Sequence, residues 1–285
     1  MENTVLVLGA TGTVGREVVA GLRRKGIPVR AGTRLPNSPA ATRLECELVE
    51  CDFERPETYP PALAGARSVF LIARPGDEHA DEFARPLIDE MIRQGVGHVV
   101  NLSAMGADTR DDFSLRKVER YLEESGLEWT HLRPNWFMQI FSTRPLLTAI
   151  RATGKIQVPA GDARISFIDA RDVAAVATAA LTEPGHQGKA YTLTGPDALD
   201  HVSVARAISS VTGRAVEYLA LSEDQARSGL RLSGMEAERI ERLIAFYRLV
   251  RHGACAPVSA DLPGILERAP ISFAQFAQDN ASAWA

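Results

Sequence analysis

Short apolar runs alternate with amphipathic stretches over the first half of the chain. Runs such as Val5-Leu-Val-Leu8 are apolar at every position, as expected for strands buried on both faces of a sheet. The predicted strands span residues 5–8, 29–33, 47–51, 68–73, 98–102 and 129–133. The predicted helices span residues 16–25, 56–63, 77–94 and 112–125. This alternation predicts an α/β fold with a doubly wound parallel sheet.

The pattern changes after Pro134. The segments predicted beyond it are a strand end and an alanine-rich helix at 167–181, strands at 189–193 and 215–220, a helix at 202–212 and an amphipathic helix at 236–250. We therefore expect residues 1–134 to form the core with the sheet. Residues 135–285 are expected to add mostly helical segments that cover the carboxyl ends of the strands, intertwined with the core as one structural unit.

Three glycines follow the first strand and open the first helix. Their spacing, Gly9-x-x-Gly12-x-x-Gly15, is that of a dinucleotide-binding turn. The first glycine permits a tight turn, the second lets the backbone approach a pyrophosphate, and the third lets helix and strand pack closely. The helix N-terminus then directs N–H groups at the phosphates. The cofactor-binding residues predicted here are Gly9, Thr11, Gly12, Thr13, Val14 and Gly15.

The end of the second strand distinguishes NAD from NADP. An NAD site carries an acidic residue there for the ribose 2′-hydroxyl, whereas an NADP site carries a cation for the 2′-phosphate. This chain has Thr33 and Arg34 there, and no acid between residues 29 and 34. A guanidinium offers a planar fork of donors, so Arg34 is the expected phosphate clamp. The alternative is that Arg34 is one of many solvated arginines. The prediction is NADP(H).

Composition narrows the class of protein. With 45% apolar and 24% charged residues, and no apolar run of about 18 residues, the chain is typical of a globular protein without a membrane span. Its start shows no secretory pattern, so we expect a cytoplasmic protein. The net charge of −4 gives no reason to expect a nucleic-acid partner. Three cysteines and six histidines lack metal-ligand spacing, so no metal is expected.

Beyond the glycine turn, a series of short motifs resembles one known family. In chain order they are Gly9-Ala-Thr-Gly-Thr-Val-Gly15, Cys51-Asp-Phe53, Val69-Phe-Leu-Ile72, Leu102-Ser-Ala-Met-Gly106, Ser125-Gly-Leu-Glu-Trp-Thr-His-Leu-Arg-Pro134, Phe137-Met-Gln139, Phe167-Ile-Asp-Ala-Arg-Asp172 and Tyr191-Thr-Leu-Thr-Gly-Pro196. Over nearly its whole length the chain resembles the NmrA-like, atypical short-chain dehydrogenases/reductases, which include bacterial quinone oxidoreductase-like and ketoreductase members. The resemblance implies a Rossmann fold and an NAD(P)H-dependent reaction.

The resemblance also implies positions around the cofactor. It places Asp52 and Phe53 by the adenine, and Ser103 beside the nicotinamide. The residues that it places under the ribose are Ile72, Ala73, Arg74 and Pro75. The residues that it places at the far wall of the nicotinamide site are Pro134, Asn135, Trp136 and Phe137.

The chain departs from the wider superfamily at the catalytic pair. Catalytic members carry Tyr-x-x-x-Lys on one helix face, so that the lysine lowers the tyrosine pKa and holds the nicotinamide ribose. Those positions fall here at Asp111 and Leu115, which cannot do that work. Lys117 is two residues out of register, which turns its side chain by about 200°. The catalytic candidates are Ser103 and Lys117, and the alternative for Lys117 is a solvated surface lysine.

Two functions of different class follow from these features. The first is an NADPH-dependent reductase that transfers hydride to a quinone or polycyclic aromatic ketone, such as an antibiotic- or polyketide-tailoring ketoreductase. Orientation would drive the reaction, and Ser103, a ribose hydroxyl or water would supply the proton. The second is a redox sensor that binds NADP(H) without turnover and acts through a partner.

Apolar residues after Pro134 favour the enzyme. Those predicted to line a slot for a flat substrate are Trp136, Met138, Phe141, Phe167 and Tyr247. The alternative is that they are core residues. No charge run or exposed apolar stretch in the sequence suggests a surface for a sensor's partner. We therefore predict a reductase, monomeric or homodimeric, that acts on a small aromatic molecule.

Overall fold

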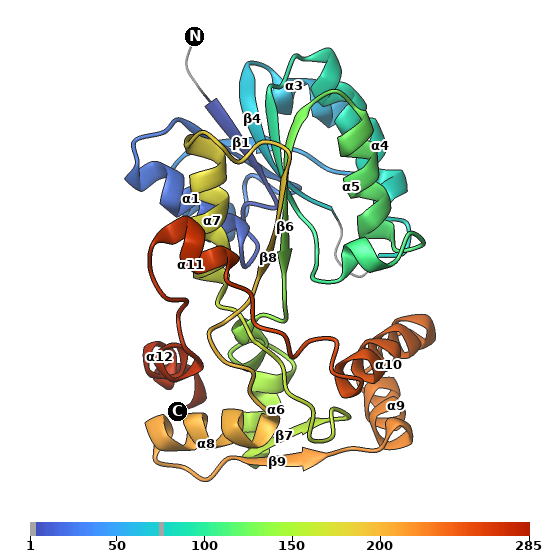
Figure 1. Cartoon of the computed structure of the whole chain (residues 1–285), viewed down its shortest axis with the longest axis vertical. Coiled ribbons are helices and arrows are strands. Elements are labelled where there is room, and N and C mark those ends of the chain that lie inside the picture. The colour runs from blue at the N-terminus through green and yellow to red at the C-terminus, as the bar shows by residue number, and fades with distance from the viewer. Residues whose placement is uncertain (1–3, 74–76) are drawn as a thin grey trace. The chain divides into compact units, whose positions relative to one another are not determined.

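The chain folds as two compact units. A computed structural model describes residues 4–73 and 77–285. The first unit comprises Met1–Pro134, Ala170–Leu193 and Asp261–Arg268, and the second comprises Asn135–Asp169, Thr194–Ala260 and Ala269–Ala285. The chain thus first leaves the first unit at residue 134, where the sequence pattern changes, and then returns to that unit twice (Figure 1).

A seven-stranded parallel sheet forms the centre of the first unit. Its strand order is β3-β2-β1-β4-β5-β6-β8, so the order reverses between β1 and β4. The strands are β1 (Thr4–Leu8), β2 (Val29–Thr33), β3 (Glu47–Glu50), β4 (Ala66–Ile72), β5 (His98–Leu102), β6 (Glu128–Pro134) and β8 (Lys189–Leu193). Leu6, Val69 and Val99 have no exposed surface, as expected for strands covered on both faces. The predicted doubly wound α/β fold is confirmed.

Helices cover both faces of this sheet. Figure 1 shows α1 and α7 on one face and α4 and α5 on the other. The helices and 3-10 turns of the first unit are α1 (Gly15–Arg24), α2 (Pro39–Thr42), η1 (Pro56–Thr58), α3 (Tyr59–Leu63), α4 (Ala80–Arg93), η2 (Ala107–Thr109), α5 (Ser114–Glu124), α7 (Ala170–Thr182) and α11 (Asp261–Leu266). On α5, Leu115, Val118 and Leu122 are buried at the spacing of one helix face, which faces the core.

The second unit has its own small sheet and core. Strands β7 (Lys155–Val158) and β9 (Glu217–Ala220) pair in parallel. The helices and 3-10 turn are η3 (Met138–Phe141), α6 (Leu146–Thr153), α8 (His201–Thr212), α9 (Glu223–Leu232), α10 (Ala237–Arg251), α12 (Phe273–Asp279) and α13 (Ala281–Trp284). This part is mostly helical, as predicted. Across both units, none of the described helices is long and apolar enough to cross a membrane.

Some segments differ from the sequence prediction. The strand end predicted from Phe167 is not a strand, since Ile168 forms only an isolated bridge with Phe137. The sequence does not predict β7, because four residues give a weak alternation and the partner strand β9 lies far along the chain. The helix predicted from residue 77 begins at Ala80.

Candidate functional site

The turn after β1 requires glycine at two positions. Gly9 has a left-handed backbone, with φ +59°, and its carbonyl accepts a hydrogen bond from the Gly12 N–H at 2.8 Å. A Cβ on Gly15 would lie 2.3 Å from that same carbonyl oxygen. The start of α1 therefore approaches the end of β1 more closely than any side chain at position 15 allows. This is the close approach that a dinucleotide-binding turn requires.

The N-terminus of α1 begins at this turn. Val14 is its N-cap, and no side chain in the described part of the chain caps the helix. The first N–H groups of a helix have no partners within the helix, and with the helix dipole they favour a bound anion. Thr11 and Thr13, predicted to contact the cofactor, are half-buried on the same turn. The arrangement fits a pyrophosphate whose oxygens accept these N–H groups.

Ile72, at the end of β4, lies beside the turn. A Cβ on Gly9 would be 3.3 Å from Ile72 Cδ1, so two residues predicted around the cofactor are neighbours in the structure. Ala73 is buried next in the chain. Arg74 and Pro75, which the resemblance places in the same segment, lie outside the described residues.

The residues predicted at the adenosine end follow β2 and β3. Thr33 is buried and its hydroxyl accepts a backbone hydrogen bond at 3.3 Å, while Arg34 is exposed. The half-buried Asp52 accepts a hydrogen bond from the Glu54 N–H at 3.1 Å, which stabilises the local turn. Phe53 packs partly against the core. The contacts of Asp52 and Phe53 are structural, and their role beside an adenine stays a prediction.

A cavity of about 360 Å³ lies beside Thr11. The charged residues that line it are Arg16, Glu17, Arg23 and Arg43. Arg23 donates to the Leu44 carbonyl at 3.2 Å and pairs with Glu45 at 3.3 Å. Arg43 is exposed, and its guanidinium forms no hydrogen bond or ion pair with any described residue. Sequence reasoning missed Arg43, because it follows the short helix α2, which the pattern does not predict.

Ser103 lies directly after β5, on the other side of the order reversal from β2. It is 6% exposed, and its backbone N–H donates to the Leu132 carbonyl at 2.7 Å. That bond continues the β5–β6 ladder one step beyond the strand, so the position of Ser103 is fixed. Its hydroxyl has no hydrogen-bond partner within the described ranges.

A buried ion network lies next to Ser103. Arg133 of β6 donates to both carboxylate oxygens of Glu119 on α5, at 2.9 and 2.8 Å, and Arg116 donates to one of them at 2.9 Å. Arg133 also pairs with Asp108 at 2.7 Å. Glu119 has no exposed surface. Burial raises its pKa, but the two hydrogen bonds from Arg133 outweigh burial and hold the pKa below its usual value.

His131 lies at one side of this network. It is fully buried, stacks on Trp129 with ring centroids 4.4 Å apart, and has its Nε2 atom 3.4 Å from Glu123. Burial lowers its pKa to about 4, so it is neutral at pH 7. The ring, Glu119 and Glu123 are close enough to hold a metal ion. Arg116 already pairs with both carboxylates and Arg133 pairs with Glu119, however, so two cations offset the two negative charges without a metal ion.

Lys117 lies on a different face of α5 from Glu119. Two residues along a helix correspond to a rotation of about 200°, and Glu119 faces β6 through Arg133. The Lys117 ammonium forms no ion pair with a residue that the structure describes. Leu115, at the position of the superfamily's lysine, packs in the core. The catalytic role of Lys117 therefore stays a prediction without a supporting contact.

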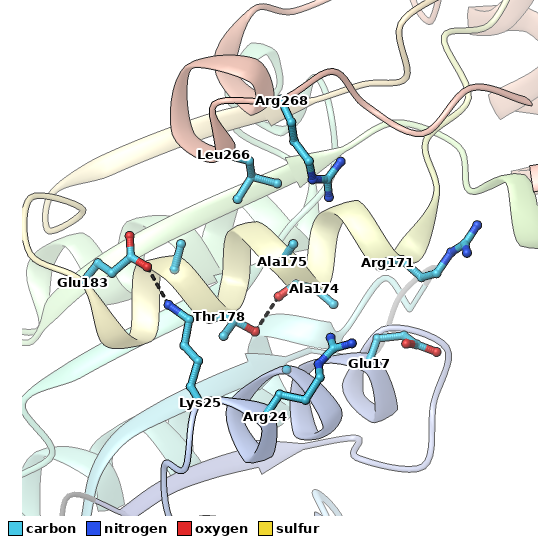
Figure 2. A pocket seen from close by; sticks show the side chains of 12 residues that line it. Glu17, Arg24, Lys25, Arg171, Ala174, Ala175, Thr178, Glu183, Leu266 and Arg268 are labelled. Atoms are coloured by element: carbon cyan, nitrogen blue, oxygen red, sulfur yellow. Dashed lines mark hydrogen bonds and ion pairs between the residues drawn. The ribbon is translucent and has the colours of Figure 1, made fainter. Parts of the chain in front are cut away.

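Lys25, one of only four lysines in the chain, has a partner away from this edge of the sheet. Figure 2 shows it reaching from α1 to Glu183 after α7, at 2.6 Å. The two helices cross closely there, since a Cβ on Gly21 would lie 2.6 Å from Thr178 Oγ1. The cations that line the adjoining groove of about 420 Å³ are Arg24, Lys25, Arg171 and Arg268. Lys25 and Glu183 form a half-exposed ion pair at the surface, and such a pair adds little to the stability of the protein.

The predicted substrate residues all lie in the second unit. Phe141 and Phe167 are fully buried, meet edge to face at 5.2 Å, and share one cluster with Met138. Their contacts are those of core residues. Trp136 is half-buried, with its ring tilted against Tyr247 at 5.2 Å. Of this set, Trp136 has the most exposed surface for a ligand.

Residues 134–137 lead from β6 into the second unit. The Pro134 carbonyl accepts a hydrogen bond from the Met105 N–H at 3.0 Å. The Asn135 side-chain NH₂ donates to Ser166 Oγ at 2.7 Å and to a backbone carbonyl at 2.8 Å. Its N–H donors are therefore occupied by residues of the second unit. Phe137 forms a bridge with Ile168. Their predicted contacts with a cofactor stay predictions.

Comparison with known proteins identifies the family. A family model described as NAD(P)H-binding matches residues 9–184, which include the glycine turn, Ser103 and the ion network. The chain belongs to this family. An NAD(P)H azoreductase of Xenophilus azovorans is 34% identical to it over 287 residues, which cover 98% of this chain and 99% of the relative.

Solved structures share the fold. An NADPH-dependent quinone oxidoreductase of Escherichia coli, crystallised with NADPH, matches with a TM-score of 0.84 at 24% identity, covering 96% of this chain and 99% of that one. NmrA, a negative transcriptional regulator solved with NAD, matches with a TM-score of 0.77 at 17% identity, covering 98% and 95%. The resemblance drawn from the sequence motifs is confirmed.

Proposed function

We propose that the protein is an NADPH-dependent reductase that transfers hydride to the carbonyl of a quinone or a polycyclic aromatic ketone. The observation that carries this proposal is the approach of Gly15 to Gly9, which opens the backbone to a pyrophosphate. Bound NADPH supplies the hydride, and the residues of the chain hold the nicotinamide and the acceptor. Tailoring of an aromatic polyketide or antibiotic is the physiological role that we propose for it.

The charges beside the turn support NADP(H) over NAD(H). No acid follows β2, where an NAD site would hold the ribose 2′-hydroxyl. Arg34 is exposed there, and Arg16 and Arg43 line the cavity beside Thr11. A 2′-phosphate carries charge that guanidinium groups hold in a bidentate manner. We therefore assign Arg34 and Arg43 to the 2′-phosphate.

The proposed reaction proceeds without a Tyr-x-x-x-Lys pair. Asp111, before α5, is exposed and Leu115 on α5 is a core residue, so the two positions of that pair hold neither a tyrosine nor a lysine. Holding two reactants in line supplies about 7–11 kcal/mol of barrier lowering on its own. Conjugated acceptors such as quinones and aryl ketones suit such an enzyme, because they accept a hydride readily. The names of the relatives, azoreductase and quinone oxidoreductase, point to conjugated small molecules as well.

Turnover with a panel of acceptors tests the proposal. The purified protein is mixed with NADPH and, in separate reactions, with quinones, polycyclic aryl ketones and an azo compound. Steady NADPH consumption that depends on the acceptor is the expected result. Tight NADPH binding with no turnover across the whole panel would contradict the proposal and favour a redox sensor.

A further inference from the structure

Tyr247 differs from the other tyrosines of the chain in its hydroxyl. The chain has five tyrosines. Four of them form a hydrogen bond through the hydroxyl, at 2.6–3.2 Å, and these are Tyr59, Tyr121, Tyr191 and Tyr218. The Tyr247 hydroxyl forms none within the part of the chain that the structure describes. A buried tyrosine usually finds a partner for its hydroxyl, so the Tyr247 hydroxyl is available to a ligand.

The ring of Tyr247 is held in the core of the second unit. Tyr247 lies on the buried face of α10, together with Ile240, Ile244 and Val250. The residue is 5% exposed and belongs to the main apolar cluster of the unit. Its hydroxyl oxygen is not among the fully enclosed atoms that lack a partner, so the small exposed part of the residue includes this atom. A fixed apolar ring thus presents one polar atom that a ligand can reach.

Trp136 lies beside Tyr247. The two ring centroids are 5.2 Å apart, and the rings are tilted by 52°. The Trp136 N–H donates to the side-chain oxygen of Asn135 at 2.9 Å, and its carbonyl accepts from the Ile168 N–H at 2.9 Å, so its backbone is fixed. The residue is half-buried, so part of its surface is open to a ligand. An indole ring offers a flat apolar surface against which an aromatic ring can stack.

The Tyr247 hydroxyl is a hydrogen-bond donor at neutral pH. Burial raises the pKa of Tyr247 above its usual value, so the hydroxyl keeps its proton. A carbonyl oxygen has no proton and can only accept a hydrogen bond. A flat aromatic ring that carries a carbonyl group therefore matches both groups, the indole and the hydroxyl.

We propose that Trp136 and Tyr247 bind the acceptor of the reaction, with its ring stacked on Trp136 and its carbonyl oxygen accepting a hydrogen bond from the Tyr247 hydroxyl. This inference rests on the proposed function, because the acceptor is the carbonyl compound named there. It makes the hydroxyl of Tyr247 the group that selects acceptors with an oxygen at the reacting position.

The hydrogen bond from Tyr247 stabilises charge that develops during the reaction. Hydride moves with its electron pair from C4 of NADPH to the carbonyl carbon, the π electrons of the carbonyl bond move to the oxygen, and NADP⁺ forms. A donor binds the resulting alkoxide more strongly than the neutral carbonyl, so the hydrogen bond lowers the barrier. Water then gives the oxygen its proton and becomes hydroxide. Tyr247 keeps its own proton and acts as a catalytic residue through its hydrogen bond.

Tyr247→Phe tests the hydrogen bond, because it removes the hydroxyl and keeps the ring. kcat and KM are measured with NADPH and the best carbonyl acceptor of the panel. We expect kcat to fall about 100-fold, since loss of one donor to a developing oxyanion has effects of this size. The dissociation constant of NADPH and the free energy of unfolding in urea should not change, since the hydroxyl has no partner among the described residues. An unchanged kcat would overturn the inference.

Tyr218→Phe is the matched control. Tyr218 is half-buried on β9 of the same unit, and its hydroxyl donates to the Val158 carbonyl at 3.2 Å. This variant should lose unfolding free energy and keep its kcat, which is the reverse of the result expected for Tyr247→Phe. An equal fall of kcat in the two variants would show that the loss of any tyrosine hydroxyl in this unit impairs turnover, and the inference would fail.

Trp136→Leu tests the stacking contact. The variant keeps an apolar side chain and loses the flat ring. We expect the KM of the acceptor to rise about fivefold with little change in kcat, because an aromatic pair contributes about 1 kcal/mol beyond the area that it buries. An unchanged KM would remove Trp136 from the acceptor site.

The outcomes separate this inference from the proposed function. A wild type that oxidises NADPH with none of the carbonyl acceptors contradicts the proposed function and this inference with it. A wild type that turns over a carbonyl acceptor, with a Tyr247→Phe variant of the same kcat, overturns the inference alone, and the reductase stands.

Discussion

The two sides of the strand-order reversal in the first unit carry different kinds of groups. On the β1–β2 side the proposed site consists of backbone and exposed arginines: the turn from Gly9 to Gly15, Arg34 and Arg43. On the β5–β6 side it consists of the buried Ser103 and the buried ion pair between Glu119 and Arg133. The first side can bind by shape and Coulomb attraction, while the second can hold one group in one orientation. The difference suggests that affinity resides mainly on the first side and orientation on the second.

The largest effect is expected from Glu119→Ala. Removing the carboxylate leaves two arginines with one fewer buried partner, and breaking a buried pair costs about 3–5 kcal/mol. Urea unfolding measures the loss. The control is Glu223→Ala, since Glu223 also holds arginines but at the surface of the second unit. Equal losses of unfolding free energy in the two variants would show that the buried network stabilises the protein no more than a surface network does.

The next largest effect is expected from Gly15→Ala, which alters the turn on the β1–β2 side of the strand-order reversal. The added Cβ would lie 2.3 Å from the Gly9 carbonyl oxygen, so the turn must open. We expect NADPH to bind about 100-fold more weakly, because a shift of the order of 1 Å at a binding turn has effects of this size. Gly229→Ala, on a helix with open space around the new methyl group, is the matched control. Unchanged NADPH affinity in Gly15→Ala would contradict the assignment of the turn.

His131 makes the stability of the β5–β6 side depend on pH. Burial lowers its pKa from 6.5 to about 4 in the folded protein. Between these values the unfolded chain binds a proton that the folded chain does not, so stability falls as pH falls. From pH 7 to pH 5 the loss from this residue is about 2 kcal/mol. When the free energy of unfolding is measured by urea titration at several pH values, His131→Asn should remove this part of the pH dependence. An unchanged pH dependence in His131→Asn would contradict the assignment.

The smallest effect is expected from the arginines of the β1–β2 side. Arg43→Ala and Arg34→Ala should each weaken NADPH binding about tenfold, because one charge-assisted contact to the 2′-phosphate is lost. NADH binding should not change. Arg24→Ala, which alters an exposed arginine on the other groove of α1, should affect neither cofactor. A parallel loss for NADH and NADPH would place these arginines away from the 2′-phosphate.

Sequence reasoning identified the β1–β2 side better than the β5–β6 side. The three glycines lie within seven consecutive residues between a strand and a helix, so spacing alone indicates the turn. Glu119 and Arg133 lie on a helix and the following strand, and nothing in their spacing shows that they meet. Arg43 was missed because it follows the short helix α2, which the sequence pattern does not predict. The sequence proposed an apolar set after Pro134 as substrate residues, which stays a prediction. The exposure that separates Trp136 from the core residue Phe167 can be known only from the fold.

The strands were predicted well where apolar runs are continuous, as in β1 and β4. They were missed where pairing depends on distant partners, as in β7 with β9. The sequence likewise did not predict that the chain returns to the first unit through α7 and α11, because this depends on tertiary contacts. Their sequences are ordinary amphipathic or alanine-rich helices, which fit either unit.

Hydride transfer itself is the most direct test of the account. NADPH deuterated at one or the other C4 position is mixed with the protein and the best acceptor of the panel, and the rate of NADPH oxidation is compared for the two labels. The account predicts a normal primary isotope effect for one label and almost none for the other, because the enzyme presents one face of the ring. Oxidation at the same rate with both labels, or no oxidation with any acceptor, would contradict it.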